Sequence, residues 1–491
     1  MSRILLRLCL CTVFLSNQAL GQTLSTTRIS LGHPANGDLE RIGHYLAVSG
    51  FSAQSRWLSL IGLGDFEHMS VSIPAEAQFF GRMTLAGHEQ EQLVFLTEHG
   101  LSVFSPERQR HMNLVEVSSL YSVADEQRLR FKDFVQDVNG SGLSDFLIPD
   151  FHLYHLLVQQ SDGTFDRYQL PIDALVRTRD DTVQYRPRRP FLMDINLDGK
   201  TDVAFVRDGK LWAFLQQEGG TFAEQAQIID PGVRLSPDHE ANVRTGDGRS
   251  FEDLRIYRVH DFQDLDGDGL TDLVVREEVF ESAIDQNSTY RIHYGRKGSS
   301  GLEFPAEPDT GIATSGFQFE PVFEDITGNG RKDFYTPSAQ FGVRAIIRAL
   351  LRGNARLDIE FYVMDESRSF PSEPNYRHRV SADVSIGAAR VDLPLVKTAC
   401  FDDTGRKSLL IGEKRDELAV YAPAQGRLFE REPTRFSMPL PRDGARARVL
   451  DLDHGLAQEL VLPFDAQDDA AHRNQVLLLR LVEEHSGNSS R

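Results

Sequence analysis

One nine-residue stretch, Asp264-Leu265-Asp266-Gly267-Asp268-Gly269-Leu270-Thr271-Asp272, carries the main structural signal of this sequence. Its general form is Asp-x-[Asn/Asp/Thr]-x-[Asp/Ser/Asn]-Gly-x-x-Asp, and an apolar run follows it. Three more intact copies occupy residues 137–145, 194–202 and 325–333. Because one pattern returns four times, the sequence indicates a repeat protein.

Degenerate copies extend the series in both directions. One begins at Asp402 and reads as two residues short, one begins at Asp451, and a weak one follows Leu85. The six clearer copies begin at residues 137, 194, 264, 325, 402 and 451, which gives separations of 57, 70, 61, 77 and 49. Strand-like runs fill these intervals, for example residues 202–206 and 210–215. Periods of about 40 to 60 residues filled with short strands are typical of propeller blades.

The repeats predict an all-β fold, a single β-propeller of about seven four-stranded blades, with eight possible. The weak copy near residue 85 is the seventh unit, and an eighth is suggested by strand-like residues 44–61. The propeller is expected to span residues 22–485, with a disordered tail at 486–491. Apolar residues at helical spacing predict one short inserted helix near 343–352.

The first 21 residues differ from the rest. Arg3 and Arg7 accompany a short apolar stretch, and small residues, Ala19 and Gly21, end the segment. This pattern predicts a signal peptide cleaved before Gln22, and the stretch is too short to span a bilayer. The expected location is therefore the periplasm or the outside of the cell.

The charge of the chain limits its partners. The 491 residues hold 53 Lys+Arg and 72 Asp+Glu, a formal net charge of −19. Nucleic acid is not an expected partner, because binding to a phosphate backbone needs clustered Lys and Arg. No transmembrane segment is expected, and the partner is predicted to be a protein or a glycan of unknown identity. An arginine-rich stretch from Arg177 to Arg189 is interpreted as a solvated loop, with an anionic glycan or protein partner as the alternative.

The repeated loop has the chemistry of a calcium site. Oxygen-bearing side chains at positions 1, 3, 5 and 9 surround one point once a Gly at position 6 lets the chain turn, and calcium takes six to eight such oxygens. An EF-hand is excluded, because position 12 lacks the required Glu and strand-like runs follow. Metal-free acidic turns are the alternative, but four carboxylates in the third loop are expected to repel each other without a cation.

The four intact loops resemble the FG-GAP or VCBS repeats of integrin-α-type propellers and their bacterial secreted relatives. The resemblance covers residues 80 to 465 and implies one calcium ion per intact loop, about four in all. The side-chain ligands it implies are Asp137, Asn139, Ser141 and Asp145; Asp194, Asn196, Asp198 and Asp202; Asp264, Asp266, Asp268 and Asp272; and Asp325, Thr327, Asn329 and Asp333. The implied carbonyl ligands belong to Leu143, Lys200, Leu270 and Arg331. Because the third loop has four Asp, it is predicted to be the most securely occupied.

The sequence predicts a binding protein and not an enzyme. No catalytic motif is found, and Cys400 is expected to be a buried small residue. The predicted function is a non-catalytic, calcium-binding propeller that serves as a protein-interaction or adhesion scaffold. The alternatives are a carbohydrate-binding, lectin-like propeller and a polysaccharide lyase or hydrolase built from distant loops on one end of the ring.

Overall fold

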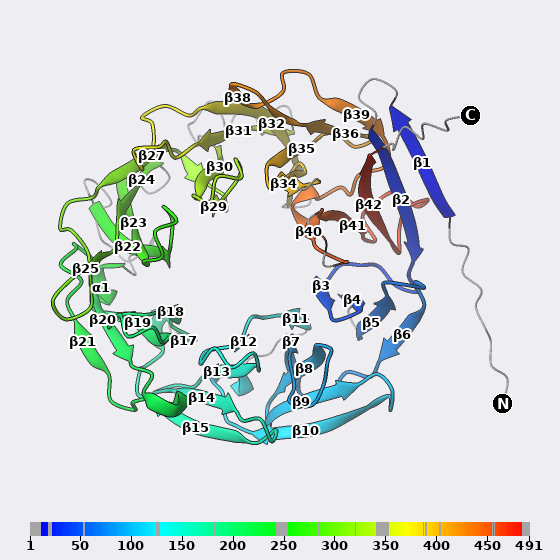
Figure 1. Ribbon diagram of the computed structural model, residues 1–491. Coiled ribbons are helices and arrows are strands. Elements are labelled where there is room, and N and C mark those ends of the chain that lie inside the picture. The colour runs from blue at the N-terminus through cyan, green and yellow to red at the C-terminus, as the bar shows by residue number, and fades with distance from the viewer. Residues whose placement is uncertain are drawn as a thin grey trace, which may run out of the picture.

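Eight antiparallel sheets follow one another around a central axis, and Figure 1 shows them as a ring. The structure is a computed structural model. It describes residues 11–17, 22–52, 55–123, 128–179, 182–241, 254–282, 285–319, 321–339, 353–385, 387, 390–401, 404–453, 455 and 457–483. Each sheet is one blade of a β-propeller, so the predicted all-β fold is confirmed.

The first four blades are built from consecutive strands. Blade 1 contains β3 (Leu39–Ile42), β4 (Tyr45–Phe51), β5 (Arg56–Gly62) and β6 (His68–Val71). Blade 2 contains β7 (Ala77–Met83), β8 (Gln92–Thr97), β9 (Gly100–Ser105) and β10 (Arg110–Glu116). Blade 3 contains β12 (Val135–Gln136), β13 (Asp145–Pro149), β14 (Tyr154–Gln159) and β15 (Phe165–Leu170). Blade 4 contains β18 (Phe191–Met193), β19 (Asp202–Arg207), β20 (Lys210–Phe214) and β21 (Gln227–Ile229).

The last four blades close the ring. Blade 5 contains β22 (Leu254–Gln263), β23 (Asp272–Ser282), β24 (Asp285–His293) and β27 (Thr310–Ser315). Blade 6 contains β29 (Val322–Glu324), β30 (Asp333–Ala339), β31 (Asn354–Tyr362) and β32 (Tyr376–Ser385). Blade 7 contains β34 (Val396–Cys400), β35 (Lys407–Lys414), β36 (Glu417–Tyr421) and β39 (Thr434–Ser437). Blade 8 contains β40 (Arg448–Leu450), β41 (Glu459–Phe464), β42 (Gln475–Glu483) and β2 (Gln22–Ser30).

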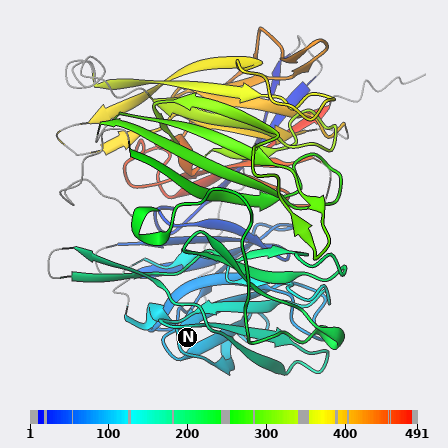
Figure 2. The ribbon, with the colours of Figure 1, turned by 90° about the vertical axis from the view of Figure 1, so that its left-hand side faces the viewer.

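Smaller elements decorate the blades. β11 (Arg130–Phe131) pairs with β7, and β28 (Phe317–Gln318) and β33 (Arg390–Asp392) extend blade 6. Three hairpins stand between blade strands: β16 (Leu175–Arg179) with β17 (Thr182–Arg186), β25 (Arg296–Lys297) with β26 (Leu302–Glu303), and β37 (Pro423–Ala424) with β38 (Arg427–Phe429). Figure 2 shows the first of these projecting from one face of the ring. The described helical turns are η1 (Leu120–Val123), η2 (Glu218–Gly220), α1 (Asp238–Ala241) and η3 (Gly444–Arg446).

The ring is closed by the two ends of the chain. β2 pairs antiparallel with β42 along its whole length, from Gln22 opposite Glu483 to Ser30 opposite Gln475. An additional strand, β1 (Cys11–Asn17), pairs with the outer edge of β2 and lies within the segment predicted to be a signal peptide. β2 itself begins at Gln22, the first residue after the predicted cleavage point.

The hydrophobic core lies between neighbouring blades. The rings of Tyr154 in blade 3 and Phe205 in blade 4 lie 4.8 Å apart, centroid to centroid. Phe361 in blade 6 and Phe429, in the β37–β38 hairpin between β36 and β39 of blade 7, are similarly close at 5.2 Å. Because each blade buries its faces against its neighbours, the ring places the described loops between strands at its two ends.

The predicted blade count of about seven is corrected to eight, the number given as possible. Blade 1 is the unit predicted only as a possible eighth, at residues 44–61. Its first two strands are joined by a short turn at Gly43 and His44, with Ile42 opposite Tyr45, so it has no nine-residue loop to recognise. The helix predicted near 343–352 lies outside the described residues.

Candidate functional site

The repeated loops join the first and second strands of blades 2 to 8. In each of these blades the residue before the loop pairs with the ninth loop residue, for example Gln263 with Asp272 and Glu324 with Asp333. The four intact copies therefore lie in blades 3, 4, 5 and 6, on the same face of the ring. The same register corrects the copy in blade 7. Ala399 pairs with Ser408, so this loop has the full nine residues and begins at Cys400.

The first Asp of each intact loop folds the loop around its carboxylate. Asp264 accepts hydrogen bonds from the backbone N–H groups of Gly267 at 2.7 Å and Gly269 at 2.9 Å. Asp325 does the same with Gly328 and Gly330. Asp137 and Asp194 accept instead from the N–H groups of the fifth and sixth loop residues. Gly269 has a φ of 84°, a left-handed conformation that favours glycine. This geometry explains why Gly is kept at the sixth position.

The ninth Asp anchors the loop to the blade. Asp145 is fully buried, and its two oxygens accept backbone N–H groups from Val138 at 2.9 Å and Gln159 at 2.8 Å. Asp202, Asp272 and Asp333 make the equivalent pair of bonds. Burial raises the pKa of these carboxyls, to about 6 for Asp145, Asp202 and Asp333 and about 7 for Asp272. The ninth Asp therefore stabilises the hairpin, in addition to its predicted role as a calcium ligand.

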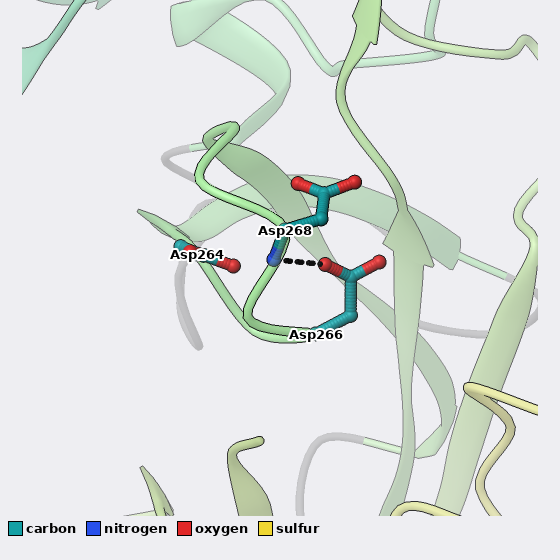
Figure 3. A group of neighbouring side chains, drawn as sticks. All are labelled: Asp264, Asp266 and Asp268. Atoms are coloured by element: carbon teal, nitrogen blue, oxygen red, sulfur yellow. Dashed lines mark hydrogen bonds between the residues drawn. The ribbon is translucent and has the colours of Figure 1, made fainter. Parts of the chain in front are cut away.

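The third loop brings three carboxylates together, as Figure 3 shows. Asp264, Asp266 and Asp268 each offer an oxygen, and these oxygens lie within 4.8 Å of one another. The backbone N–H of Asp268 donates to Asp266 at 3.1 Å and holds the turn. Burial raises the pKa of Asp266, and the neighbouring Asp268 raises it further. Hard oxygen donors at this spacing suit a divalent cation.

The other three loops are less acidic. Among the described residues, no second group of three His, Cys, Asp or Glu side chains meets the same distance criterion. Amides and hydroxyls replace carboxylates in these loops and bond to the turn, as when Asn139 accepts from the Ser141 N–H at 3.0 Å. In the second loop Lys200 donates its Nζ to Asp198 at 3.1 Å. The remaining predicted residues lie in the same turns: Leu143, Asn196, Leu270, Thr327, Asn329 and Arg331.

A guanidinium reaches the third loop from the next blade. Arg368, between β31 and β32 of blade 6, donates from Nη1 to Asp266 Oδ2 at 2.7 Å and to Asp268 Oδ2 at 3.3 Å. The turn that presents it is held by Asp365, whose Oδ1 accepts the N–H groups of Ser367 and Ser369. The pKa of Arg368 is raised, mainly by the charge of Asp266. The sequence analysis missed this partner, since it lies 102 residues from Asp266.

Neighbouring loops also touch through their backbones. The N–H of Lys332 in the fourth loop donates to the Leu265 carbonyl in the third loop at 2.7 Å. The N–H of Lys407 donates to the Ile326 carbonyl at 2.9 Å, which joins the loops of blades 7 and 6. Hydrogen bonds thus join the loops of neighbouring blades directly.

The arginine-rich stretch divides into two parts. Arg188 is buried and donates from Nη2 to Asp238 Oδ2 at 2.7 Å, while Arg189 pairs with Asp261 at 2.8 Å. These two arginines connect structural elements. Arg186 lies on the projecting hairpin and is exposed together with Val183 and Tyr185.

One cluster of Ser, His and Asp side chains occurs beside a groove between blades 2 and 3. The Ser118 hydroxyl donates to Asp150 Oδ2 at 2.6 Å, and His155 Nε2 lies 3.3 Å from the same hydroxyl and 3.4 Å from the same carboxylate oxygen. In a catalytic triad the Ser and Asp bond to opposite nitrogens of the imidazole. Here both approach Nε2, so the cluster holds β14 to the end of β10 and lacks the geometry of a Ser-His-Asp relay.

Comparisons with known proteins give likeness in fold only. No protein-family model matches the chain, and no curated protein matches it. An Agrocybe aegerita lectin that recognises non-reducing terminal N-acetylglucosamine is 12% identical, with a TM-score of 0.43 over 96% of this chain and 98% of that one. The Dos1 propeller is 9% identical, with a TM-score of 0.42 over 91% and 95% of the two chains. The dihydro-heme d1 dehydrogenase NirN is 12% identical, with a TM-score of 0.37 over 89% and 75%.

Two smaller observations bear on the sequence analysis. Cys400 is buried, as expected. In the part of the chain that the structure describes, no helix has the length and apolar character needed to cross a bilayer.

Proposed function

We propose that this protein is an exported, calcium-stabilised β-propeller that acts as a non-catalytic binding scaffold in the periplasm or outside the cell. The observation that carries the proposal is the set of four intact loops, one in each of four consecutive blades, on one face of the ring. Each loop already folds around its first carboxylate and is anchored by its ninth. The resemblance to FG-GAP or VCBS repeats rests on these loops.

The residues of the third loop fit a calcium ion best. Three carboxylates offer oxygens within 4.8 Å of one another, and carboxylate oxygens are the donors that calcium prefers. The Arg368 guanidinium pairs with two of these carboxylates. This contact indicates that a nearby positive charge stabilises the group of carboxylates. A bound divalent ion would supply that charge and tie positions 1, 3 and 5 together.

Thermal unfolding of the full chain tests calcium binding. We expect the melting temperature to fall when EGTA replaces millimolar calcium, and to recover when calcium but not magnesium is restored, because mass action stabilises the state that binds the ion. Calorimetric titration of the chelated protein should give about four sites. An identical melting curve in excess chelator and in excess calcium would exclude the calcium part of the proposal.

Carbohydrate binding is the second candidate function. It is favoured by the groove between blades 2 and 3, whose lining includes Arg167, Glu116 and Tyr168. A scaffold and a lectin differ in the partner that they hold, so both are compatible with the calcium loops. Binding of a saccharide in the groove would distinguish a lectin from a protein-binding scaffold.

A further inference from the structure

A long groove separates the outer strands of blades 2 and 3. It consists of two cavities of about 630 Å³ and 470 Å³ that share Glu116 and Arg167 in their linings. The larger cavity reaches the turn at Glu98 and His99, and the smaller reaches the turn at Gly163 and Thr164. Because these turns lie at opposite ends of their strands, the groove runs along the height of the blades.

The walls of the groove are the two outermost strands of the blades. β10 pairs only with β9, and β15 pairs only with β14, so each leaves one edge uncovered in the part of the chain that is described. Leu157 is buried at the floor, and Phe165 is partly buried there. Rigid strands on both sides make this a preformed groove, as ligand sites usually are.

Four ionisable side chains in this groove have no hydrogen-bond or ion-pair partner among the described residues. Within the described residues, the side chains of Glu98, His99, Glu116 and Arg167 make no hydrogen bond or ion pair, and all four are exposed. Elsewhere most described arginines of the blades are paired with carboxylates, as Arg291 is with Glu277 and Arg379 with Asp358. Arg167 is therefore available to a ligand.

Two other side chains in the groove are held in place. His155 is fixed by Ser118 and Asp150, at 3.3 Å and 3.4 Å from its Nε2. The Tyr168 ring packs edge-on against Phe222 with centroids 5.9 Å apart and remains partly exposed. A positioned imidazole and a positioned aromatic ring add a hydrogen-bonding group and an apolar platform at little cost in entropy.

The charges of the groove select the class of ligand. One Arg and two Glu leave the groove with no excess of positive charge, so it does not suit a phosphate or another strong anion. Glu98 and Glu116 accept hydrogen bonds, and Arg167 donates them in a fixed fork. A neutral ligand with adjacent hydroxyl groups satisfies both kinds of side chain, and its C–H surface can lie on the Tyr168 ring. Sugars have this combination, and the two joined cavities are larger than one sugar ring needs.

We propose that the groove between β10 and β15 is a binding site for a neutral oligosaccharide, with Arg167 and Glu116 as the central hydrogen-bonding pair and Tyr168 as the stacking surface. This inference rests on the proposed binding function and gives it a ligand class. An extended peptide pairing with the free edge of β10 is the competing occupant. It is an outcome of the test, because Arg and Glu side chains that line one groove offer both donors and acceptors to hydroxyl groups.

An oligosaccharide array tests the site with the full chain. The labelled protein, with calcium present, is applied to printed neutral, N-acetylated and uronic-acid-containing oligosaccharides, and hits are measured by calorimetry. We expect binding to neutral oligosaccharides, and expect Arg167→Ala and Glu116→Gln each to weaken it about 10- to 100-fold, as the loss of a hydrogen bond to a charged group would. Arg110→Ala and Glu107→Gln, both exposed and outside the groove, are the matched controls. Melting curves confirm that all four variants fold.

The outcomes separate this site from the calcium proposal. No array signal from protein that binds calcium would overturn the saccharide site and leave the calcium loops in place. Equal losses in Arg167→Ala and Arg110→Ala would also overturn it, as would binding to an immobilised peptide library without binding to the array. Saccharide binding that survives in protein with no calcium affinity would support the groove and reject the calcium proposal instead.

Discussion

Arg368 Nη1 lies 2.7 Å from Asp266 Oδ2, so the most acidic loop of blade 5 receives a positive charge from blade 6. The Asp266 side chain is fully buried, whereas that of Arg368 is half exposed. Four carboxylates in one loop suggest that an ion is needed to relieve their repulsion. The neighbouring blade relieves part of it, and a metal ion and the guanidinium would compete for the same oxygens.

Replacing Arg368 tests this competition. Arg368→Gln should raise the affinity of the third loop for calcium about tenfold, because the ion no longer displaces a charged partner. The same variant should be less stable than the parent protein in EGTA, since the buried Asp266 carboxylate loses its cation. Calcium titration and thermal unfolding measure the two effects.

Arg379→Gln is the control for this experiment. Arg379 pairs with Asp358 on the exposed surface of blade 6, so its loss should leave calcium affinity unchanged. A calcium affinity in Arg368→Gln equal to or below that of the parent would show that Arg368 does not compete with the ion.

The ninth carboxylate should matter even without metal. In Asp145→Asn an amide NH₂ replaces one oxygen and meets a backbone N–H of Val138 or Gln159, leaving a buried donor unsatisfied. We expect a loss of about 1–3 kcal/mol in the free energy of unfolding. Urea unfolding in excess EGTA measures it without a contribution from calcium. Asp162→Asn is a suitable control, because Asp162 uses a single oxygen for its bonds to Thr164, and a full loss there as well would contradict the interpretation.

The propeller was predictable from the sequence because its loops repeat with side chains of defined geometry. The first and ninth Asp both bond to backbone N–H groups close by in the same blade. Residues with such local partners recur at a fixed spacing, which the sequence shows. Blade 1 was given only as a possible eighth unit because its first two strands meet at Gly43 and His44, a turn with no such pattern. The loop from Cys400 to Ser408 was misread as short because both of its anchoring carboxylates are replaced.

The partners of the site could not be predicted in the same way. Arg368 meets Asp266 only because two blades are adjacent in the ring, and Arg167 and Glu116 line one groove for the same reason. Contacts between blades depend on how each blade is rotated relative to the next. Such contacts produce no repeated pattern in the sequence. The loops were therefore found from the sequence, whereas the cation beside the third loop and the groove required the structure.

Acid should destabilise the protein through His260. Burial, together with the charges of Arg276 and Arg189, lowers the pKa of His260 to about 4. In the unfolded chain the pKa of this imidazole is about 6.5, so the unfolded state binds the proton first. The contribution of His260 to stability is therefore complete above about pH 6.5 and is lost as the pH falls toward 4. The expected loss is about 2–3 kcal/mol.

His260→Phe should flatten this pH dependence. The imidazole already lies among aromatic rings, 5.1 Å from Tyr290 and 5.8 Å from Phe323, so a phenyl ring suits the site. Urea unfolding at a series of pH values compares it with His152→Phe, which changes an exposed residue. Equal slopes of stability against pH in His260→Phe and the parent would show that another group is responsible.

Removal of residues 1–21 tests the predicted signal peptide against the ring itself. β2 begins at Gln22 and pairs with β42 up to Glu483, so ring closure needs nothing before Gln22. A chain that starts at Gln22 should therefore fold with the melting temperature of the exported protein, and N-terminal sequencing of the exported protein should begin at Gln22. The longer deletion of residues 1–30 also removes β2 and should prevent closure, because the outer strand of blade 8 is lost. If the shorter deletion unfolds the protein as the longer one does, β1 is a structural strand and the segment is not a cleaved signal.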